Sequence, residues 1–366
     1  MNVLLNGATG GTNFGDFLFA QMFQDYVGSI VGKENLYWYD GLFSMSDFYK
    51  NHLRYNRSYK LKNIDTLVCI SGGYFCGNDH SKRDYIIRYF SYFHIALRCI
   101  FHKIPVAIVA VEVGKSKNHF IDMIQKFILK KAKLVVVRNQ ESFEQLKQYG
   151  IKNAICTADS AHAINNDFFA TRYIPEEMLN INSPKMFFHV QLSQIDASYR
   201  VLPAINVFLK RHPDYYVIVG TDQYVPDQKE RLQEVIKRIK CDRVLINQYE
   251  DPVALCKVLD NVDFIVTPKL HVGIVGATLG KSVVSFSIHN EKIVRFYNQL
   301  NENGRSLPMA KFDDAKAIDM LETYHNKPMH VSSEIISKAQ DNFEMLGDFL
   351  LKVSECCGGE NEENNK

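Results

Sequence analysis

The sequence contains no long hydrophobic run and no marked surplus of one charge. No window approaches the roughly 20 consecutive apolar residues that a membrane-spanning helix needs, so we expect no transmembrane segment. The 366 residues include 43 Lys and Arg against 41 Asp and Glu, which gives a formal net charge of only +2. Nucleic-acid-binding proteins usually carry a strong basic surplus, so this balance gives no support for a nucleic-acid partner.

Metal-binding and disulfide patterns are also missing. The eight cysteines are scattered singly, apart from Cys356 and Cys357, and none has CxxC spacing. The histidines show neither HExxH nor another paired spacing, and no Asp-x-Asp motif stands where a metal-dependent sugar-nucleotide transferase would need one. We therefore expect no metal site and no disulfide framework. The chain starts directly with the strand-like residues 3–5, so we expect no signal peptide and a reduced, cytoplasmic protein.

Two further catalytic or nucleotide-binding patterns are absent. No GxSxG run occurs, so a catalytic triad built on a serine nucleophile has no support from the sequence. The glycine-rich run at residues 7–16 is not a P-loop, because no Lys-Ser/Thr pair closes it, and its spacing fits GxGxxG poorly. No internal repeat of convincing similarity is present.

What the sequence does contain is a regular alternation of strand-like and helix-like segments, which predicts an α/β fold with parallel sheets. The strand-like runs are 3–5, 66–71, 106–111, 134–138, 154–157, 186–190, 215–220, 243–246, 263–266 and 283–286. The helix-like runs are 17–27, 84–101, 120–131, 141–149, 197–211, 229–240, 252–260, 272–279 and 332–353.

The length of the chain suggests two domains, and a polar break at residues 165–184 separates two series of strands. We expect an N-terminal Rossmann-like domain over residues 1–170 and a C-terminal one over 171–330. A final helix at 331–354 would cross back to the first domain, and a polar tail at 355–366 would be disordered. Two doubly wound domains facing a cleft would bind ligands at the carboxyl ends of their strands.

The most informative segment follows the apolar run at residues 263–266. The run ends at Pro268, and Lys269 and His271 come immediately before a small-residue helix. A cation and an imidazole at a helix N-terminus favour an anionic ligand such as a phosphate or carboxylate. Lys292, beyond the next strand, is a further cation that could face the same ligand.

Glycine-rich segments follow two strands of the first half. In the run at 7–16, the glycines permit close approach of a ligand, and Asp16 could cap the following helix. Ser71, Gly72 and Gly73 follow the second of these strands. A turn without function explains either segment alone, but two such turns at equivalent strand ends favour a binding site.

Two charged residues complete the candidates. Arg138 closes an apolar strand where a helix begins, so it could grip an anion with both guanidinium nitrogens, or pair with a nearby carboxylate. Asp159 could orient a cation, bind hydroxyl groups of a substrate, or cap a helix.

Taken in order, these segments resemble the motifs of the polysaccharide pyruvyl transferase family over roughly residues 1 to 300. The family has an Asn-x-Gly-Asp turn, a glycine-rich strand end, an Arg-Asp-x-x-Ser motif, an Ala-Asp pair and an Arg-Leu-His-Gly motif with a downstream Lys. The matching segments here are Asn13-Phe14-Gly15-Asp16, Ser71-Gly72-Gly73, Arg138-Asn139-Gln140-Glu141-Ser142, Ala158-Asp159, and Lys269-Leu270-His271-Val272 with Lys292.

The resemblance implies a two-domain fold like that of the GT-B glycosyltransferases. It also implies transfer of the enolpyruvyl group of phosphoenolpyruvate onto sugar hydroxyls of a polysaccharide or its precursor, such as an exopolysaccharide, to form a pyruvate ketal. No cofactor is expected, because phosphoenolpyruvate is the donor substrate. By this resemblance, Arg138 and His271 bind or activate the donor, with Lys269 and Lys292 as further donor-binding cations.

For the saccharide acceptor we expect binding residues in the first domain, namely Asn13, Asp16, Gly72, Gly73 and Asp159. The acceptor sugar and any lipid carrier stay open, and a lipid-linked acceptor would place a cytoplasmic enzyme at the inner face of the membrane. His271 either transfers protons or only binds phosphate. The sequence gives no indication of oligomeric state.

Three residues depart from the family pattern: Lys269 replaces Arg, Val272 replaces Gly, and Asn139 replaces Asp. Lysine keeps the charge but loses the bidentate fork of arginine. These departures leave a non-catalytic carbohydrate-binding paralogue as one alternative. A sugar-nucleotide-dependent glycosyltransferase of the same GT-B-like fold is the other.

Overall fold

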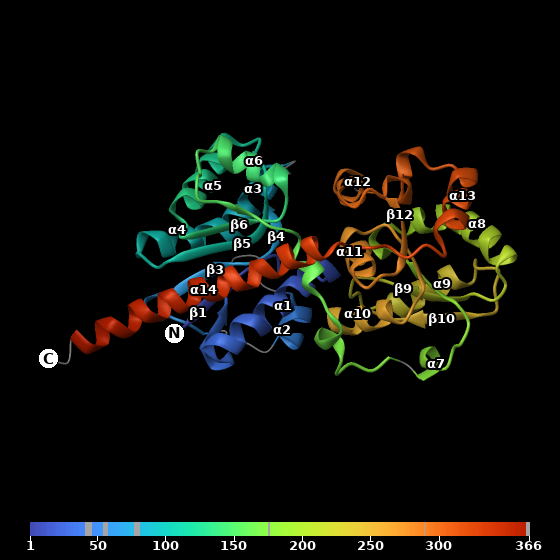
Figure 1. Cartoon of the computed structure of the whole chain (residues 1–366), viewed down its shortest axis with the longest axis horizontal. Coiled ribbons are helices and arrows are strands. Elements are labelled where there is room, and N and C mark those ends of the chain that lie inside the picture. Colours follow the sequence, from blue (N-terminus) through green and yellow to red (C-terminus); the bar gives the residue numbers. More distant parts are fainter. Residues whose placement is uncertain (41–45, 54–57, 77–80, 175, 289, 364–366) are drawn as a thin grey trace. The chain divides into compact units, whose positions relative to one another are not determined.

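The computed structural model describes residues 1–40, 46–53, 58–76, 81–174, 176–288 and 290–363, and these residues form two compact units (Figure 1). The first unit contains Met1–Thr12, Asp16–Ala163 and Ser333–Lys366, and the second contains Asn13–Gly15 and Ile164–Ser332. The sequence analysis placed the boundary after residue 170. In the structure the chain enters the second unit at Ile164, and the C-terminal helix belongs to the first unit.

The first unit is built on a seven-stranded sheet in which every described strand pair is parallel. Its order is β2-β1-β3-β5-β6-β7, with β4 paired to β5. The strands are β1 (Val3–Asn6), β2 (Leu36–Trp38), β3 (Thr66–Cys69), β4 (Gly72–Phe75), β5 (Val106–Val113), β6 (Leu134–Val137) and β7 (Ile155–Cys156). The chain runs outward from β1 in both directions, so the order reverses between β1 and β3.

Helices cover both faces of this sheet. Apolar residues of α4, α5 and α6 share one core with strand residues such as Leu67, Ile108 and Val135. On the other side α14 packs beside α1, with the Phe343 and Phe23 rings 4.8 Å apart. The helices are α1 (Phe14–Val31), α2 (Asp47–His52), α3 (Lys82–Arg88), α4 (His94–Phe101), α5 (His119–Lys131), α6 (Gln140–Gln148) and α14 (Ser333–Glu363).

The sequence predicted one helix at residues 84–101, but the structure divides it. A π-helical segment, η3 (Tyr89–Phe93), joins α3 to α4. π-Helical turns are rare and frequently mark functional sites. Here the wider turn carries Ser91 and Tyr92 to a pocket described below.

The second unit has a six-stranded parallel sheet in the order β10-β9-β8-β11-β12-β13. Counted along this unit, the order is 3-2-1-4-5-6, that of a doubly wound nucleotide-binding sheet, and the order reverses between β8 and β11. The strands are β8 (Lys185–His189), β9 (Tyr216–Gly220), β10 (Val244–Asn247), β11 (Phe264–Thr267), β12 (Ser282–Ser287) and β13 (Ser306–Pro308).

One face of this second sheet is covered by α8, α9 and α13, whose apolar residues share a core with β8, β9 and β11. Against the other face, α11 approaches so closely that a Cβ atom at Gly276 would lie 2.5 Å from Ile265 Cδ1. The helices are α7 (Glu176–Leu179), α8 (Ile195–Arg211), α9 (Gln228–Ile236), α10 (Pro252–Asp260), α11 (Leu270–Thr278), α12 (Asn290–Gln299) and α13 (Asp314–Tyr324).

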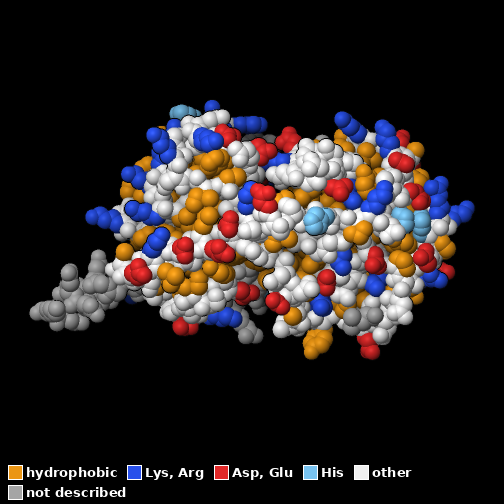
Figure 2. All heavy atoms as spheres, viewed as in Figure 1, with side chains coloured by type: hydrophobic (Ala, Val, Ile, Leu, Met, Phe, Trp, Pro, Cys, Tyr) orange, Lys and Arg blue, Asp and Glu red, His pale blue; other side chains and the backbone are white. Residues whose placement is uncertain are grey.

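The C-terminal helix α14 is longer than the sequence predicted. It continues to Glu363, whereas we expected a disordered tail from residue 355, and residues 364–366 lie outside the described part. Within the described residues, no helix combines the length and apolarity needed to cross a membrane. Figure 2 shows acidic and basic side chains interspersed over the visible face of each unit.

Candidate active site

Polar side chains converge at the carboxyl edge of the second sheet, where β9, β8 and β11 lie side by side. His189 is the last residue of β8 and Thr267 the last of β11, and His189 Nδ1 lies 2.7 Å from Thr267 Oγ1. His189 Nε2 lies 3.1 Å from Asp222 Oδ1, two residues beyond β9. This cluster lies where the strand order reverses, which is where doubly wound sheets bind their ligands.

Asp222 joins this buried cluster to the cationic segment found in the sequence. Its Oδ2 atom lies 3.8 Å from Lys269 Nζ, and its side chain is 5% exposed. Burial alone would raise the pKa of Asp222, but the charge of His189, a hydrogen bond from it and the charge of Lys269 together hold the pKa below its usual value. Asp222 is therefore an ionised carboxylate that fixes an imidazole and an ammonium group.

Lys269 and His271 lie at the N-terminus of α11, as the sequence predicted. Lys269 is the N-cap residue, and its backbone N–H donates to Thr267 Oγ1 at 3.0 Å. His271 is the second residue of the helix, and both side chains are half-buried. The helix dipole and its free N–H groups favour an anion at this position.

Residues 13–15 pack against the same cluster. The Phe14 N–H donates to the Asp222 carbonyl at 2.7 Å, and Asn13 forms an isolated antiparallel bridge with Gln223. A Cβ atom at Gly15 would overlap the imidazole ring of His271. The Asn-x-Gly part of the first motif therefore shapes the surroundings of His271, whereas we expected Asn13 to bind an acceptor in the first domain.

Two of the remaining motif positions in this unit have clear structural settings. Val272, which replaces the family glycine, is completely buried in the first turn of α11. Lys292 lies in the first turn of α12, directly after β12, and is half-buried. Each of these helices begins at the carboxyl edge of the sheet.

In the first unit, Arg138 is buried between two carboxylates. Its Nη2 atom lies 3.0 Å from Glu112 Oε2, and its Nη1 atom lies 3.0 Å from Asp159 Oδ2. Burial acts to lower the pKa of Arg138, but the charges of Asp159, Glu112 and the nearby Asp16 raise it, so the guanidinium stays charged. The structure places Arg138 in ion pairs with two carboxylates, at a buried rather than a surface position.

The residues after Arg138 hold the local backbone. Asn139 is the N-cap of α6 and accepts a hydrogen bond from the Ser142 N–H at 2.9 Å, a role that asparagine and aspartate fill about equally well. The Ser142 hydroxyl accepts from the Val113 N–H at 2.8 Å. The change to Asn139 therefore preserves the cap that the family aspartate would supply.

Asp159 combines two of the roles that the sequence left open. Its Oδ2 atom pairs with Arg138, and its Oδ1 atom accepts a hydrogen bond from the Ala161 N–H at 3.0 Å. The carboxylate thus orients a cation and stabilises the 3₁₀ segment Ser160–Ala163.

A pocket of about 340 Å³ opens at the carboxyl end of β1, where the strand order of the first unit reverses. It is lined by Asn6, Gly7, Ala8, Thr9, Gly10, Gly11, Asp16, Tyr39, Ile87, Ser91 and Tyr92. The glycine-rich run therefore forms one wall of this pocket. Asp16 lies in the first turn of α1 rather than at its cap, because the helix begins at Phe14.

The second glycine-rich segment lies elsewhere. Gly72 and Gly73 belong to β4, which pairs with β5, and neither lines this pocket. A Cβ atom at Gly72 would meet the ring of Tyr74 at 2.7 Å. Close packing inside the unit accounts for that glycine, and the Ser71 hydroxyl donates to the Ala110 carbonyl.

Several residues at these sites were missed in the sequence. His189 and Asp222 were not singled out, although His189 ends one apolar strand and Asp222 follows another. Glu112 was hidden inside the apolar run of β5. Tyr92 lies within the predicted helix 84–101, in the π-helical segment that divides it, and Tyr39 follows β2, a strand that the sequence did not predict.

Comparison with known proteins identifies the family. The model of the polysaccharide pyruvyl transferase family matches residues 13–290, which include the Asn13–Gly15 segment, Arg138, Asp159, Lys269 and His271. The chain belongs to the polysaccharide pyruvyl transferase family. No curated protein sequence matches the chain.

The solved structures show the fold of this family member to be GT-B-like. UDP-GlcNAc 2-epimerase from Neisseria meningitidis, bound to UDP-GlcNAc, matches with a TM-score of 0.64 and 12% identity over 96% of this chain and 100% of that chain. Acinetobacter baumannii MurG matches with a TM-score of 0.53 and 13% identity over 96% and 100%. Anabaena HepE in complex with UDP matches with a TM-score of 0.51 and 12% identity over 99% and 100%. At these identities the likeness concerns the fold alone.

Proposed function

We propose that the protein transfers the enolpyruvyl group of phosphoenolpyruvate onto two hydroxyls of a saccharide. The methylene carbon of the donor accepts a proton and becomes a methyl group, while the first sugar hydroxyl attacks the adjacent carbon and loses its proton. The second hydroxyl then displaces phosphate, its proton leaving with the phosphate, and a pyruvate ketal remains.

The observation that carries this proposal is the grouping of Lys269, His271, His189 and Asp222 at the point of strand reversal in the second unit. The donor carries a carboxylate and a phosphate, so its site needs cations and N–H donors. Lys269 and the N-terminus of α11 supply both, and Lys292 adds a third source of positive charge from α12. The side chain of His271 is the acid or base, because an imidazole gains and loses protons near neutral pH.

Arg138 takes a different part in this proposal from the one that the family resemblance implied. An anion would reach its guanidinium only by displacing Glu112 or Asp159, each 3.0 Å away. We therefore assign the donor anion first to Lys269, His271 and Lys292, and assign Arg138 to the integrity of the first unit.

The acceptor saccharide fits the pocket at the end of β1 in the first unit. Tyr39 and Tyr92 supply aromatic surface, Asp16 and Asn6 supply acceptors and donors for sugar hydroxyls, and the glycine-rich backbone permits close approach. No charged group other than Asp16 lines this pocket among the described residues, which suits a neutral sugar.

The first experiment is a calorimetric titration with phosphoenolpyruvate, UDP and a UDP-sugar. Saturable binding of phosphoenolpyruvate that is lost in Lys269→Ala and His271→Ala, and kept in the exposed control Lys311→Ala, supports the proposal. Binding of UDP alone would instead assign the chain to sugar-nucleotide-dependent transfer. Absence of binding by any of these donors, with or without saccharide, would support the non-catalytic alternative.

A further inference from the structure

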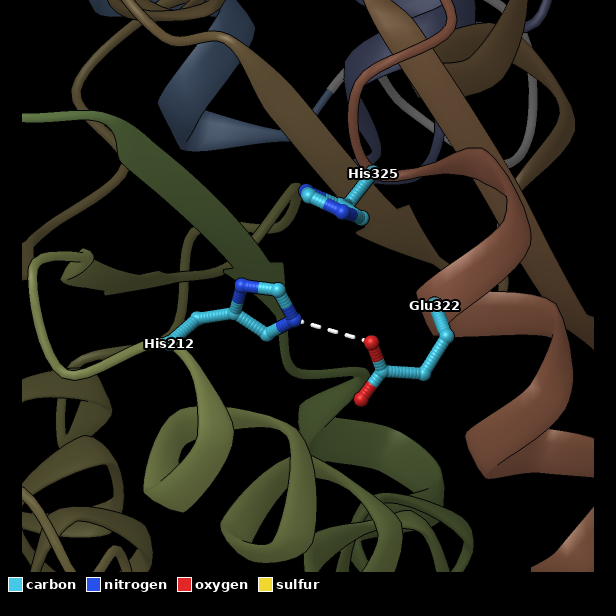
Figure 3. A group of neighbouring side chains, drawn as sticks. All are labelled: His212, Glu322 and His325. Atoms are coloured by element: carbon cyan, nitrogen blue, oxygen red, sulfur yellow. Dashed lines mark hydrogen bonds and ion pairs between the residues drawn. The ribbon is translucent and has the colours of Figure 1, made fainter.

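A second cluster of potential ligand atoms lies in the second unit, on the helices that cover one face of its sheet. His212 follows α8 directly, Glu322 lies in the last turn of α13, and His325 follows that helix. One ligand atom from each residue lies within 4.8 Å of the other two. Figure 3 shows the imidazole of His212 directed at the Glu322 carboxylate, with the ring of His325 facing them across a short gap.

This cluster is separate from the proposed donor site. His212 ends the α8 helix just before β9, which begins at Tyr216, so the cluster lies at the amino edge of the sheet. Lys269 and His271 follow β11 at the carboxyl edge. A strand of five residues, such as β9, spans about 16 Å, so the three side chains have no part in binding the donor.

The donor atoms suit a transition-metal ion. His212 Nε2 lies 2.8 Å from Glu322 Oε2, and an ion placed between these atoms would replace the shared proton. His212 and Glu322 are 24% and 28% exposed, so an ion and a completing water molecule can enter. Two imidazoles, one carboxylate and one open position form a set that Zn²⁺ commonly occupies.

Neighbouring groups hold the ligands in place. Arg211 Nη1 lies 3.2 Å from Glu322 Oε1, the oxygen that does not face His212, and Tyr215 Oη lies 3.1 Å from His325 Nδ1. Contacts of this kind orient metal ligands, and a proton on Nδ1 leaves the Nε2 lone pair for an ion. The positive charge of Arg211 would repel a cation, but its side chain is more than half exposed to solvent. The negative charge of Asp214, near His325, offsets that repulsion.

We propose that His212, Glu322 and His325 bind Zn²⁺ and that the ion clamps α13 to the end of α8. The site is structural, because it joins two helices on the same face of the sheet and lies apart from the donor-binding cluster. The spacing of the histidines in the sequence gave no indication of it, since His212 lies 110 positions before Glu322 and still farther before His325.

The test is calorimetric titration of Zn²⁺ into the untagged full chain after removal of metals with a chelator. We expect one site that is lost, or weakened by about 100-fold or more, in His325→Ala and in the isosteric Glu322→Gln, and retained in the exposed control His330→Ala. Tyr215→Phe should weaken it by about 10- to 100-fold. Circular dichroism and thermal unfolding without metal confirm that each variant folds.

Cobalt supplies an independent readout that separates this site from the cysteines. Co²⁺ held by two imidazoles and a carboxylate gives d–d absorption without the intense thiolate charge-transfer band. The melting temperature of the wild-type chain should rise with Zn²⁺, and that of Glu322→Gln should not. Absence of saturable Zn²⁺ binding, or equal binding by the wild type and both ligand variants, would overturn the proposal.

Discussion

The imidazole ring of His271 lies directly against the backbone of Gly15. A Cβ atom added at Gly15 would overlap the ring, so only glycine permits this arrangement. The neighbouring Phe14 N–H donates to the carbonyl of Asp222, whose carboxylate pairs with His189 and approaches Lys269. Two motifs more than 250 residues apart in the sequence therefore shape one group of side chains.

The contact between Gly15 and His271 predicts that Gly15→Ala displaces the imidazole. We expect kcat for phosphate release from phosphoenolpyruvate to fall by about 100-fold, because a misplaced catalytic group loses most of its effect. The control is Gly28→Ala in the same helix, where the new Cβ atom would make only ordinary contact, 3.4 Å from Lys33 Cγ. That change should keep activity and stabilise the chain by up to about 1 kcal/mol. Wild-type kinetics for Gly15→Ala would refute the positioning role.

Asp222 leads to a second prediction, which concerns stability. Asp222→Asn leaves the buried imidazole and the ammonium group without their carboxylate, so the free energy of unfolding at pH 7 should fall by about 3 kcal/mol. Because the pKa of Asp222 is lowered in the folded state, its contribution is complete above the ordinary value of 3.8 and is lost as the pH falls further.

Urea unfolding at pH 7 and pH 3 measures this effect. The difference between Asp222→Asn and the wild type should shrink at the lower pH. Asp227→Asn, a change at an exposed helix cap, should differ little from the wild type at either pH. A difference that is independent of pH would show that the charge of Asp222 is not what stabilises the cluster.

The cationic half of this site was predictable because Lys269 and His271 follow a pronounced apolar run. The other half was not. His189 and Asp222 are single polar residues, one at the end of an ordinary strand and one just after another, and only the order of β9, β8 and β11 in the sheet brings them together. That order depends on long-range pairing, which the alternation of strands and helices does not determine.

The environment of Arg138 was unpredictable for a local reason. Its partner Glu112 follows an irregularity in β5, where the register shifts between Ile108 and Val111 and Ala110 has a φ of 57°. Such a bulge redirects the side chains that follow it. The apolar run at 106–111 predicts the strand but gives no sign of the shift.

His162 gives a third prediction, which concerns the pH dependence of stability. The side chain is 4% exposed. Burial lowers its pKa to about 4, although the charge of Asp159 acts to raise it. The unfolded chain, with an ordinary histidine pKa of 6.5, binds this proton more readily. The contribution of neutral His162 to the free energy of unfolding is therefore complete above pH 6.5 and is lost as the pH falls through 4. At pH 4 the loss amounts to about 3 kcal/mol.

Urea unfolding of the wild type and of His162→Phe across this range is the measurement. His162→Phe should show a smaller loss of stability between pH 7 and pH 4, whatever its stability at pH 7. His119→Gln, at an exposed position of the same unit, should keep the wild-type dependence. Parallel curves for the wild type and His162→Phe would contradict the assignment.

The last prediction separates a structural role for Arg138 from a role in donor binding. Arg138→Ala leaves Glu112 and Asp159 as buried like charges, so we expect a loss of about 3–5 kcal/mol of unfolding free energy. Lys147→Ala breaks a solvent-exposed pair with Glu144 and removes the ammonium group from the face of the Phe143 ring, so it should change stability little. If Arg138 acts through these partners, the triple variant Arg138→Met, Glu112→Gln, Asp159→Asn should regain much of the stability and should bind phosphoenolpyruvate as the wild type does. A stable triple variant that fails to bind the donor would return Arg138 to the donor site.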